Sequence, residues 1–288
     1  MRNTIKYTYF CLALMLLLSC SNGENHFTRS HGAIVRGDTT LKEIALVFTG
    51  DEFGDGGNYI SEILGKEKIK ASFFLTGNFY RNMKFGPLIK ELLKNGNYLG
   101  SHSDRHLLYC DWTKRDSLLV SKKEFINDLE KSYSEMAKFG IKRDEARYFL
   151  PPYEWYNDSI ASWTSESGLQ LVNFTGGTRS NADYTIPGMG NQYIDSKTIY
   201  NSIISYEQQS FSGMNGFILL VHVGTDPRRT DKFYFYLPQL IKELEGKGYS
   251  FVRIDEMLIS HEGHVCFSGF FNPNPSLPLK VKGKGVNK

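Results

Sequence analysis

Short apolar runs recur along the chain and alternate with longer amphipathic segments. Seven runs predict strands, over residues 43–48, 71–75, 98–101, 146–150, 169–174, 217–221 and 249–254. Between them, apolar residues at helical spacing predict helices over 58–66, 87–94, 121–139, 158–167, 196–209 and 236–246. Such alternation favours a parallel sheet with right-handed crossovers, so we expect an α/β fold.

The first twenty residues have the pattern of an export signal. Arg2 and Lys6 precede an apolar stretch over 9–18 that is too short to span a bilayer. The stretch ends in Leu-Leu-Ser-Cys at 17–20, which resembles the lipobox of bacterial lipoproteins and implies cleavage before Cys20 and lipidation of its thiol. An ordinary secretory signal is the alternative. Under either interpretation we expect the mature chain to leave the cytoplasm. A lipobox would also anchor it by a lipid in the cell envelope, on the periplasmic side or at the outer membrane.

The remaining chain has the length of one large domain. We expect a signal over 1–20, a tether and N-terminal extension over 21–42, a barrel over 43–260 and a partly disordered extension over 261–288. The formal charge of +3 is too small to indicate a nucleic-acid partner. Cys110 and Cys266 remain as free or structural cysteines; export permits a disulfide between them, but the sequence does not show that they meet.

Polar residues stand at the ends of several predicted strands. His102 and His106 follow one strand at a spacing that places both imidazoles on one side of a helical turn. Asp51 and Glu52 follow the first strand, and His222 ends a later one. Polar side chains at the ends of several buried strands predict a metal site at the mouth of a barrel.

Four segments, in this order, resemble motifs of the polysaccharide deacetylases, the NodB-homology domain, within roughly 44–258. They are Ala-Ser-Phe-Phe-Leu-Thr-Gly at 71–77, the His-containing segment at 98–106, Phe-Leu-Pro-Pro-Tyr at 149–153 and Phe-Ile-Leu-Leu-Val-His at 217–222. The resemblance implies a distorted seven-stranded (β/α) barrel. It also implies a metal-dependent hydrolase that removes acetyl groups from an N- or O-acetylated carbohydrate.

The first motif departs from the family, which ends this strand with Thr-Phe-Asp-Asp-Gly. An ungapped alignment puts Thr49 and Gly50 at the two Asp positions. Shifting the alignment by one residue makes Asp51 the metal ligand and leaves Gly50 in place of the base. A slip of two makes Asp51 the base and Glu52 the ligand, and we favour it because an even shift keeps each side chain on its face of the strand.

The third motif departs as well. Leu150 stands where the family has an Arg that pairs with the base, and Glu154 stands where a Gly follows Pro-Pro-Tyr. Arg147 is nearby but falls on the opposite face of a regular strand. Arg179, in the loop after the fifth predicted strand, is a candidate to replace the missing Arg.

The resemblance assigns roles to the remaining candidates. His102, His106 and either Asp51 or Glu52 would hold a divalent metal ion, with Zn²⁺ expected. Asp51 would act as general base and His222 as general acid. Tyr153, Trp155 and Arg179 are candidates for substrate binding, with the backbone N–H near Tyr153 at the oxyanion.

Two classes of function remain open from the sequence. The first is the deacetylase, whose partners would be an acetylated glycan substrate and a membrane that holds the lipid anchor. The second is a non-catalytic carbohydrate-binding lipoprotein on a degenerate deacetylase barrel, in which the base and its Arg are lost. The 17 Tyr, 20 Phe and 3 Trp suit a sugar-binding cleft and a well-filled core equally. The oligomeric state is left open.

Overall fold

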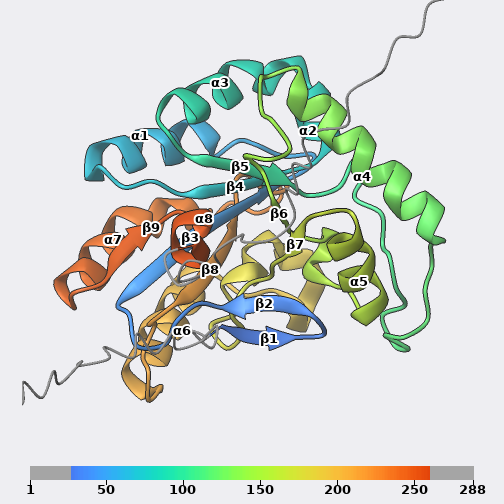
Figure 1. Cartoon of the computed structure of the whole chain (residues 1–288). Helices are drawn as coiled ribbons and strands as arrows, with labels where there is room; N and C mark the ends of the chain where they lie inside the picture. The colour runs from blue at the N-terminus through green and yellow to red at the C-terminus, as the bar shows by residue number, and fades with distance from the viewer. Residues whose placement is uncertain (1–26, 260–288) are drawn as a thin grey trace, which may run out of the picture.

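The computed structural model describes residues 27–259, in which a curled parallel sheet is surrounded by helices (Figure 1). The sheet runs in the order β7-β6-β5-β4-β3-β8, and β9 pairs with the first half of β3. Its seven strands are β3 (Glu43–Gly50), β4 (Ser72–Leu75), β5 (Tyr98–Ser101), β6 (Tyr148–Phe149), β7 (Gln170–Leu171), β8 (Phe217–His222) and β9 (Ser250–Val252). All are parallel, and the expected distorted seven-stranded (β/α) barrel is confirmed.

The helices lie between the strands. They are α1 (Gly57–Glu67), α2 (Gly77–Arg81), α3 (Gly86–Lys94), α4 (Lys122–Ala137), α5 (Asp158–Glu166), α6 (Ser196–Gln209), α7 (Leu237–Gly246) and α8 (Ile254–Ile259). Short 3-10 turns are η1 (Met83–Phe85), η2 (Pro152–Glu154), η3 (Ser180–Tyr184), η4 (Pro187–Gln192) and η5 (Phe233–Tyr236). The six predicted helices are confirmed within a few residues. The helices α2 and α8 were not predicted, because they are too short to show a helical period.

Along each strand, successive side chains point in turn to the barrel interior and to the surrounding helices. On β3, Ala45 and Val47 join the interior cluster, which also contains Leu220 of β8, whereas Leu46 and Phe48 pack in the cluster that includes the helices. Full burial of such a side chain contributes about 1.5–3 kcal/mol. This packing fixes the register of the strands, because a slip of one residue would exchange the two faces.

A hairpin that the sequence analysis did not expect lies beside the junction of β7 and β8. It consists of β1 (Thr28–Ser30) and β2 (Ala33–Arg36), within the segment interpreted as a tether and extension. The backbone N–H of Asn173 donates to the Ile34 carbonyl over 2.9 Å, and that of Thr175 donates to the Ile218 carbonyl over 3.0 Å. These bonds join the two ends of the curled sheet.

The export signal, Cys20, Cys266 and the C-terminal extension lie outside the described residues, so the predictions made on them stay predictions. Cys110 is buried and has a free thiol in the structure. Within residues 27–259, no helix combines the length and the apolar character that crossing a membrane requires.

Candidate active site

His102 lies directly after β5 and is almost completely buried. Its Nδ1 is 2.8 Å from the backbone carbonyl oxygen of Leu150. Because a carbonyl only accepts, Nδ1 carries the hydrogen and Nε2 keeps a free lone pair. Burial, and then the neighbouring His106, hold the pKa of His102 well below its usual value. The ring is therefore neutral near pH 7, which is the form that binds a metal ion.

His106 is brought to His102 by a tight loop and not by the helical turn that the spacing predicted. The ring centroids are 5.0 Å apart. Two non-glycine residues of this loop, Ser103 and His106, have left-handed backbones with φ of 74° and 55°. Ser103 Oγ accepts from the His106 N–H over 3.0 Å and closes the turn. Such backbones cost of order 1–3 kcal/mol each and persist only where the surroundings hold them.

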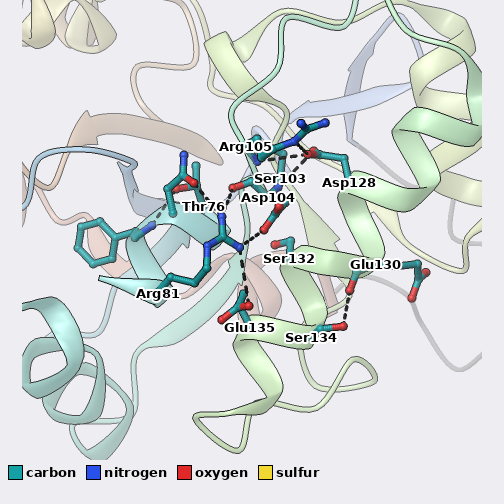
Figure 2. A network of polar contacts seen from close by, with 12 residues as sticks. Thr76, Arg81, Ser103, Asp104, Arg105, Asp128, Glu130, Ser132, Ser134 and Glu135 are labelled. Carbon is teal, nitrogen blue, oxygen red and sulfur yellow. Dashed lines mark hydrogen bonds and ion pairs between the residues drawn. The ribbon is translucent and has the colours of Figure 1, made fainter. Parts of the chain in front are cut away.

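A buried polar network holds this histidine loop (Figure 2). Asp128 of α4 is 1% exposed, and its carboxylate accepts from the backbone N–H groups of Asp104 and Arg105, both over 3.2 Å. Arg81 of α2 pairs with the Asp104 carboxylate and lies 3.7 Å from Glu135 of α4. The loop is thus anchored to two helices, which gives its strained backbone the support it needs.

Asp51, directly after β3, lies beside the histidine pair. Its Oδ1 accepts from Thr76 Oγ1 over 2.7 Å and from Asn78 Nδ2 over 3.1 Å. Burial lowers the pKa of His106, and the Asp51 charge acts against that shift, as a nearby carboxylate must. Glu52 is exposed, and no hydrogen bond or ion pair of its side chain is found among residues 27–259. Asp51 is therefore the carboxylate of this pair that the structure brings to the histidines; which of the two binds metal stays a prediction.

The histidine pair has the chemistry of a site for a divalent metal ion. Two neutral imidazoles and a carboxylate are ligands that Zn²⁺ takes, and the bond from His102 Nδ1 to a carbonyl is the usual support for a ligating Nε2. Within the described residues, however, no three His, Cys, Asp or Glu side chains converge as a complete site. The two histidines thus fit a divalent ion, but the described residues do not form a complete set of ligands around them.

His222, at the end of β8, is paired with a residue that the sequence analysis did not assign to the site. Its Nδ1 is 2.6 Å from Asp183 Oδ1, and its backbone N–H donates to Asp183 Oδ2 over 2.9 Å. Burial lowers the pKa of His222, but the charge and the hydrogen bond of Asp183 outweigh it and raise the pKa above its usual value. Asp183 comes from η3, and no sequence period connects it to a strand end.

The segment after Asp183 is held by Arg229, whose side chain is completely buried. Its Nη1 donates to the Thr185 carbonyl over 2.6 Å, and Nη2 donates to the Ile194 carbonyl over 3.0 Å and to Ser196 Oγ over 2.9 Å. One guanidinium thus binds both ends of the stretch between η3 and α6.

Glu154, noted in the sequence only as a departure from the family, also enters the site. Its Oε1 is 3.9 Å from His102 Nε2. Burial, and to a smaller extent the charge of Asp183, raise the pKa of Glu154 to about 7, while His222 acts in the opposite direction. The residue has a left-handed backbone with φ of 53°, as has Tyr153 before it, with φ of 58°.

The candidates for substrate binding separate into two groups. Tyr153 is 44% exposed, and its ring lies 4.3 Å from that of His106. Trp112, which the sequence analysis did not single out, is 54% exposed and 5.6 Å from Tyr153. Trp155 donates from Nε1 to the Asp111 carbonyl over 3.1 Å, with the Arg115 guanidinium 3.8 Å from its ring, and so is a packed residue. Arg179 is exposed in the turn before η3, and its side chain makes no hydrogen bond within 27–259.

The fold and this site define a (β/α) barrel with a histidine and carboxylate centre at the carboxyl ends of its strands. The family model described as polysaccharide deacetylase matches residues 36–172. This match confirms the resemblance to the polysaccharide deacetylases that the motifs of the sequence indicated.

Individual relatives are distant. The peptidoglycan-N-acetylglucosamine deacetylase of Bacillus cereus is 26% identical over 199 residues, which cover 69% of this chain and 80% of the relative. Among solved structures, PdaA of Bacillus subtilis, a family 4 carbohydrate esterase, gives a TM-score of 0.62 at 23% identity, over 80% of this chain and 86% of that one. A family 4 pseudoenzyme from Bacillus anthracis gives a TM-score of 0.59 at 19% identity, over 80% and 70%. These structural similarities show the fold.

Proposed function

We propose that the protein is a metal-dependent deacetylase that removes acetyl groups from an N- or O-acetylated carbohydrate. The observation that carries the proposal is the pairing of His222 with Asp183 at the same barrel mouth as the two histidines. His222 is close enough to His102 and His106 to lower the pKa of both rings. An acid and a candidate metal site on one face are what hydrolysis of an acetyl group requires.

Each residue has a defined task in this reaction. His102, His106 and Asp51 would hold the divalent ion, with Zn²⁺ expected; when bound, the ion polarises the acetyl carbonyl and favours the attack of water. His222 is oriented by Asp183 and donates a proton to the leaving amine or alkoxide. The backbone N–H of Tyr153 has no partner within 27–259 and is free to donate to the oxygen that becomes negative.

The test is acetate release by the purified protein, after elemental analysis of its metal content. The panel of substrates contains peptidoglycan fragments, chitin oligomers and acetylated xylan, because these residues do not specify which acetylated sugar is bound. Release from one class of substrate, abolished by a chelator and restored by Zn²⁺, is expected. A protein that holds metal and is inert on the whole panel would contradict the proposal.

The second candidate is a carbohydrate-binding lipoprotein without catalytic activity. It is favoured by one observation, the completely buried Leu150 at the position of the family's Arg, which leaves no guanidinium there to orient a base. Binding of glycans from the same panel, without acetate release, would support this candidate.

Replacing Trp112 by alanine is expected to weaken substrate binding. Trp112 and Tyr153 form an exposed aromatic surface that leads to His106, and stacking contacts of this kind contribute about 0.5–1.5 kcal/mol. We therefore expect KM to rise by roughly 2–10-fold with kcat unchanged, because the ring does not touch the reacting bond. Phe211→Ala, which removes another fully exposed ring, is the control and should leave KM unchanged.

We also propose that Cys20 carries a lipid that anchors the exported protein in the cell envelope. The support is the apolar stretch and the Leu-Ser-Cys sequence that ends it. Cys20→Ser is expected to move the protein out of the membrane fraction or to leave its signal uncleaved, as fractionation and mass spectrometry would show. If this variant fractionates and migrates as the wild type does, the anchor is excluded.

A further inference from the structure

On β3, this chain has no carboxylate at the position where the family carries its catalytic base. Thr49 and Gly50 occupy the two Asp positions in the ungapped alignment. A side chain at residue 50 would not fit, because its Cβ would lie 2.6 Å from Val223 Cγ1 and 2.9 Å from Leu75 Cδ2. Asp51, directly after β3, accepts two hydrogen bonds at Oδ1 and lies beside His106. Because the proposed function assigns Asp51 to the metal ion, the carboxylate that activates water has to come from another element.

Glu154, in η2, supplies a carboxylate beside His102. Its side chain is 9% exposed, with Oε1 3.9 Å from the free Nε2 of His102. No hydrogen bond to either carboxylate oxygen is found within residues 27–259, so both stay available to a ligand or a water. His222 and Asp183 lie close enough for their charges to act on Glu154.

The backbone of Glu154 is held in place although its conformation is unfavourable. The N–H donates to the Pro151 carbonyl over 3.1 Å, and the carbonyl accepts from Asn173 Nδ2 over 2.8 Å. The family has Gly at this position, which adopts a left-handed backbone without a steric penalty. A glutamate at φ of 53° is the less stable choice, and such strain is typical of positions kept for function.

A buried polar atom next to His222 gives a second, independent indication of a water. Thr49 pairs with His222 in the register of β3 and β8, and its Oγ1 is buried with no hydrogen-bond partner among the described residues. Unpaired buried hydroxyls of this kind are normally satisfied by an ordered water.

We propose that Glu154 is the general base of this deacetylase, in place of the aspartate that the family carries on β3. The proposal rests on the proposed function. The Glu154 carboxylate takes one proton from water as the water oxygen bonds to the acetyl carbon. The bond from that carbon to the sugar nitrogen or oxygen then breaks, and His222 delivers the proton that the leaving group needs. The products are acetic acid, which ionises to acetate, and the free amine or hydroxyl. The proton taken up by Glu154 returns to His222 through solvent, which restores both groups, so water is the only co-reactant.

Glu154→Gln and Glu154→Gly test the assignment, with acetate release, metal content and thermal unfolding measured on each. Both are expected to lower kcat by roughly 10²–10⁴-fold, the range for a general base, while metal content stays at the wild-type level. Glu154→Gly should unfold at the same temperature as the wild type or higher, because glycine relieves the left-handed backbone. Formate should restore part of the rate to Glu154→Gly and none to Glu154→Gln, whose amide fills the space. Glu62→Gln, an exposed change on α1, is the matched control.

Full activity of Glu154→Gln would overturn the assignment. So would loss of metal from that variant, because Glu154 would then be a metal ligand. Loss of folding in both variants would overturn it as well. Failure of the proposed function is distinct from these, because it is seen in the wild type, as metal-loaded protein that releases no acetate.

Discussion

The variant carrying both His102→Ala and His106→Ala is expected to contain no bound divalent ion, where the wild type contains about one per chain. The two rings lie 5.0 Å apart, and the Nδ1 hydrogen bond to Leu150 leaves His102 Nε2 free. Their removal leaves carboxylates alone, which bind Zn²⁺ much more weakly than a site with two imidazoles. Acetate release should fall to the background, since polarisation of the acetyl carbonyl is lost with the ion.

Elemental analysis after dialysis measures the first result directly. His31→Ala is the matched control, because His31 lies in the turn between β1 and β2 and its side chain pairs with Asp158 outside the site. Circular dichroism verifies that the double variant is folded. Unchanged metal stoichiometry in the folded double variant would show that the ion binds elsewhere.

Replacing Asp183 by asparagine is expected to lower kcat by roughly 10²–10⁴-fold, the range for a proton transfer by a positioned group. Asp183 raises the pKa of His222 and so keeps the ring protonated when the leaving group needs a proton. Activity that requires protonated His222 falls as the pH rises through this pKa. Loss of the Asp183 charge lowers the pKa, so the falling limb of the pH profile moves to lower pH.

The pH dependence of kcat and the metal content of Asp183→Asn check this result together. Metal content should stay at the wild-type level, since Asp183 contacts His222 and not the histidine pair. Asp144→Asn is the control, because this exposed carboxylate precedes β6 and lies at the opposite end of the strand from the site. A falling limb that stays at its wild-type pH would remove His222 from the role of acid.

The fold was predictable because its strands are continuous apolar runs. The runs before Thr49 and His222 are buried on both faces, as parallel strands between helices are, and this makes them clear in the sequence. The hairpin of β1 and β2 was missed, since two strands of three and four residues give too short a pattern. Its stability comes from contacts with the rest of the barrel, such as the bond from Asn173 to Ile34.

The site was predictable where a residue follows a strand directly or ends it, and at His106, which was found through its spacing to His102. His102, His222 and Asp51 do so, and the structure brings them together. Asp183 and Glu154 reach the same place from short 3-10 turns, where the direction of a side chain depends on tertiary contacts and on left-handed backbone angles. The preference for Glu52 as the ligand assumed that the strand continues past Gly50. The strand ends there and Glu52 is exposed, so alternation of faces no longer supports that preference, and which carboxylate binds metal stays a prediction.

A substitution at Arg229 can impair the pair of His222 and Asp183, although Arg229 takes no part in the chemistry. Its planar guanidinium donates to the carbonyls of Thr185 and Ile194, at the two ends of the segment between η3 and α6. A lysine carries a single point charge and would satisfy fewer of these carbonyls. Loss of this guanidinium leaves buried carbonyls unpaired and frees the segment that aims Asp183 at His222. A lineage could therefore lose activity through a position that contacts neither substrate nor metal, and keep a barrel that still folds.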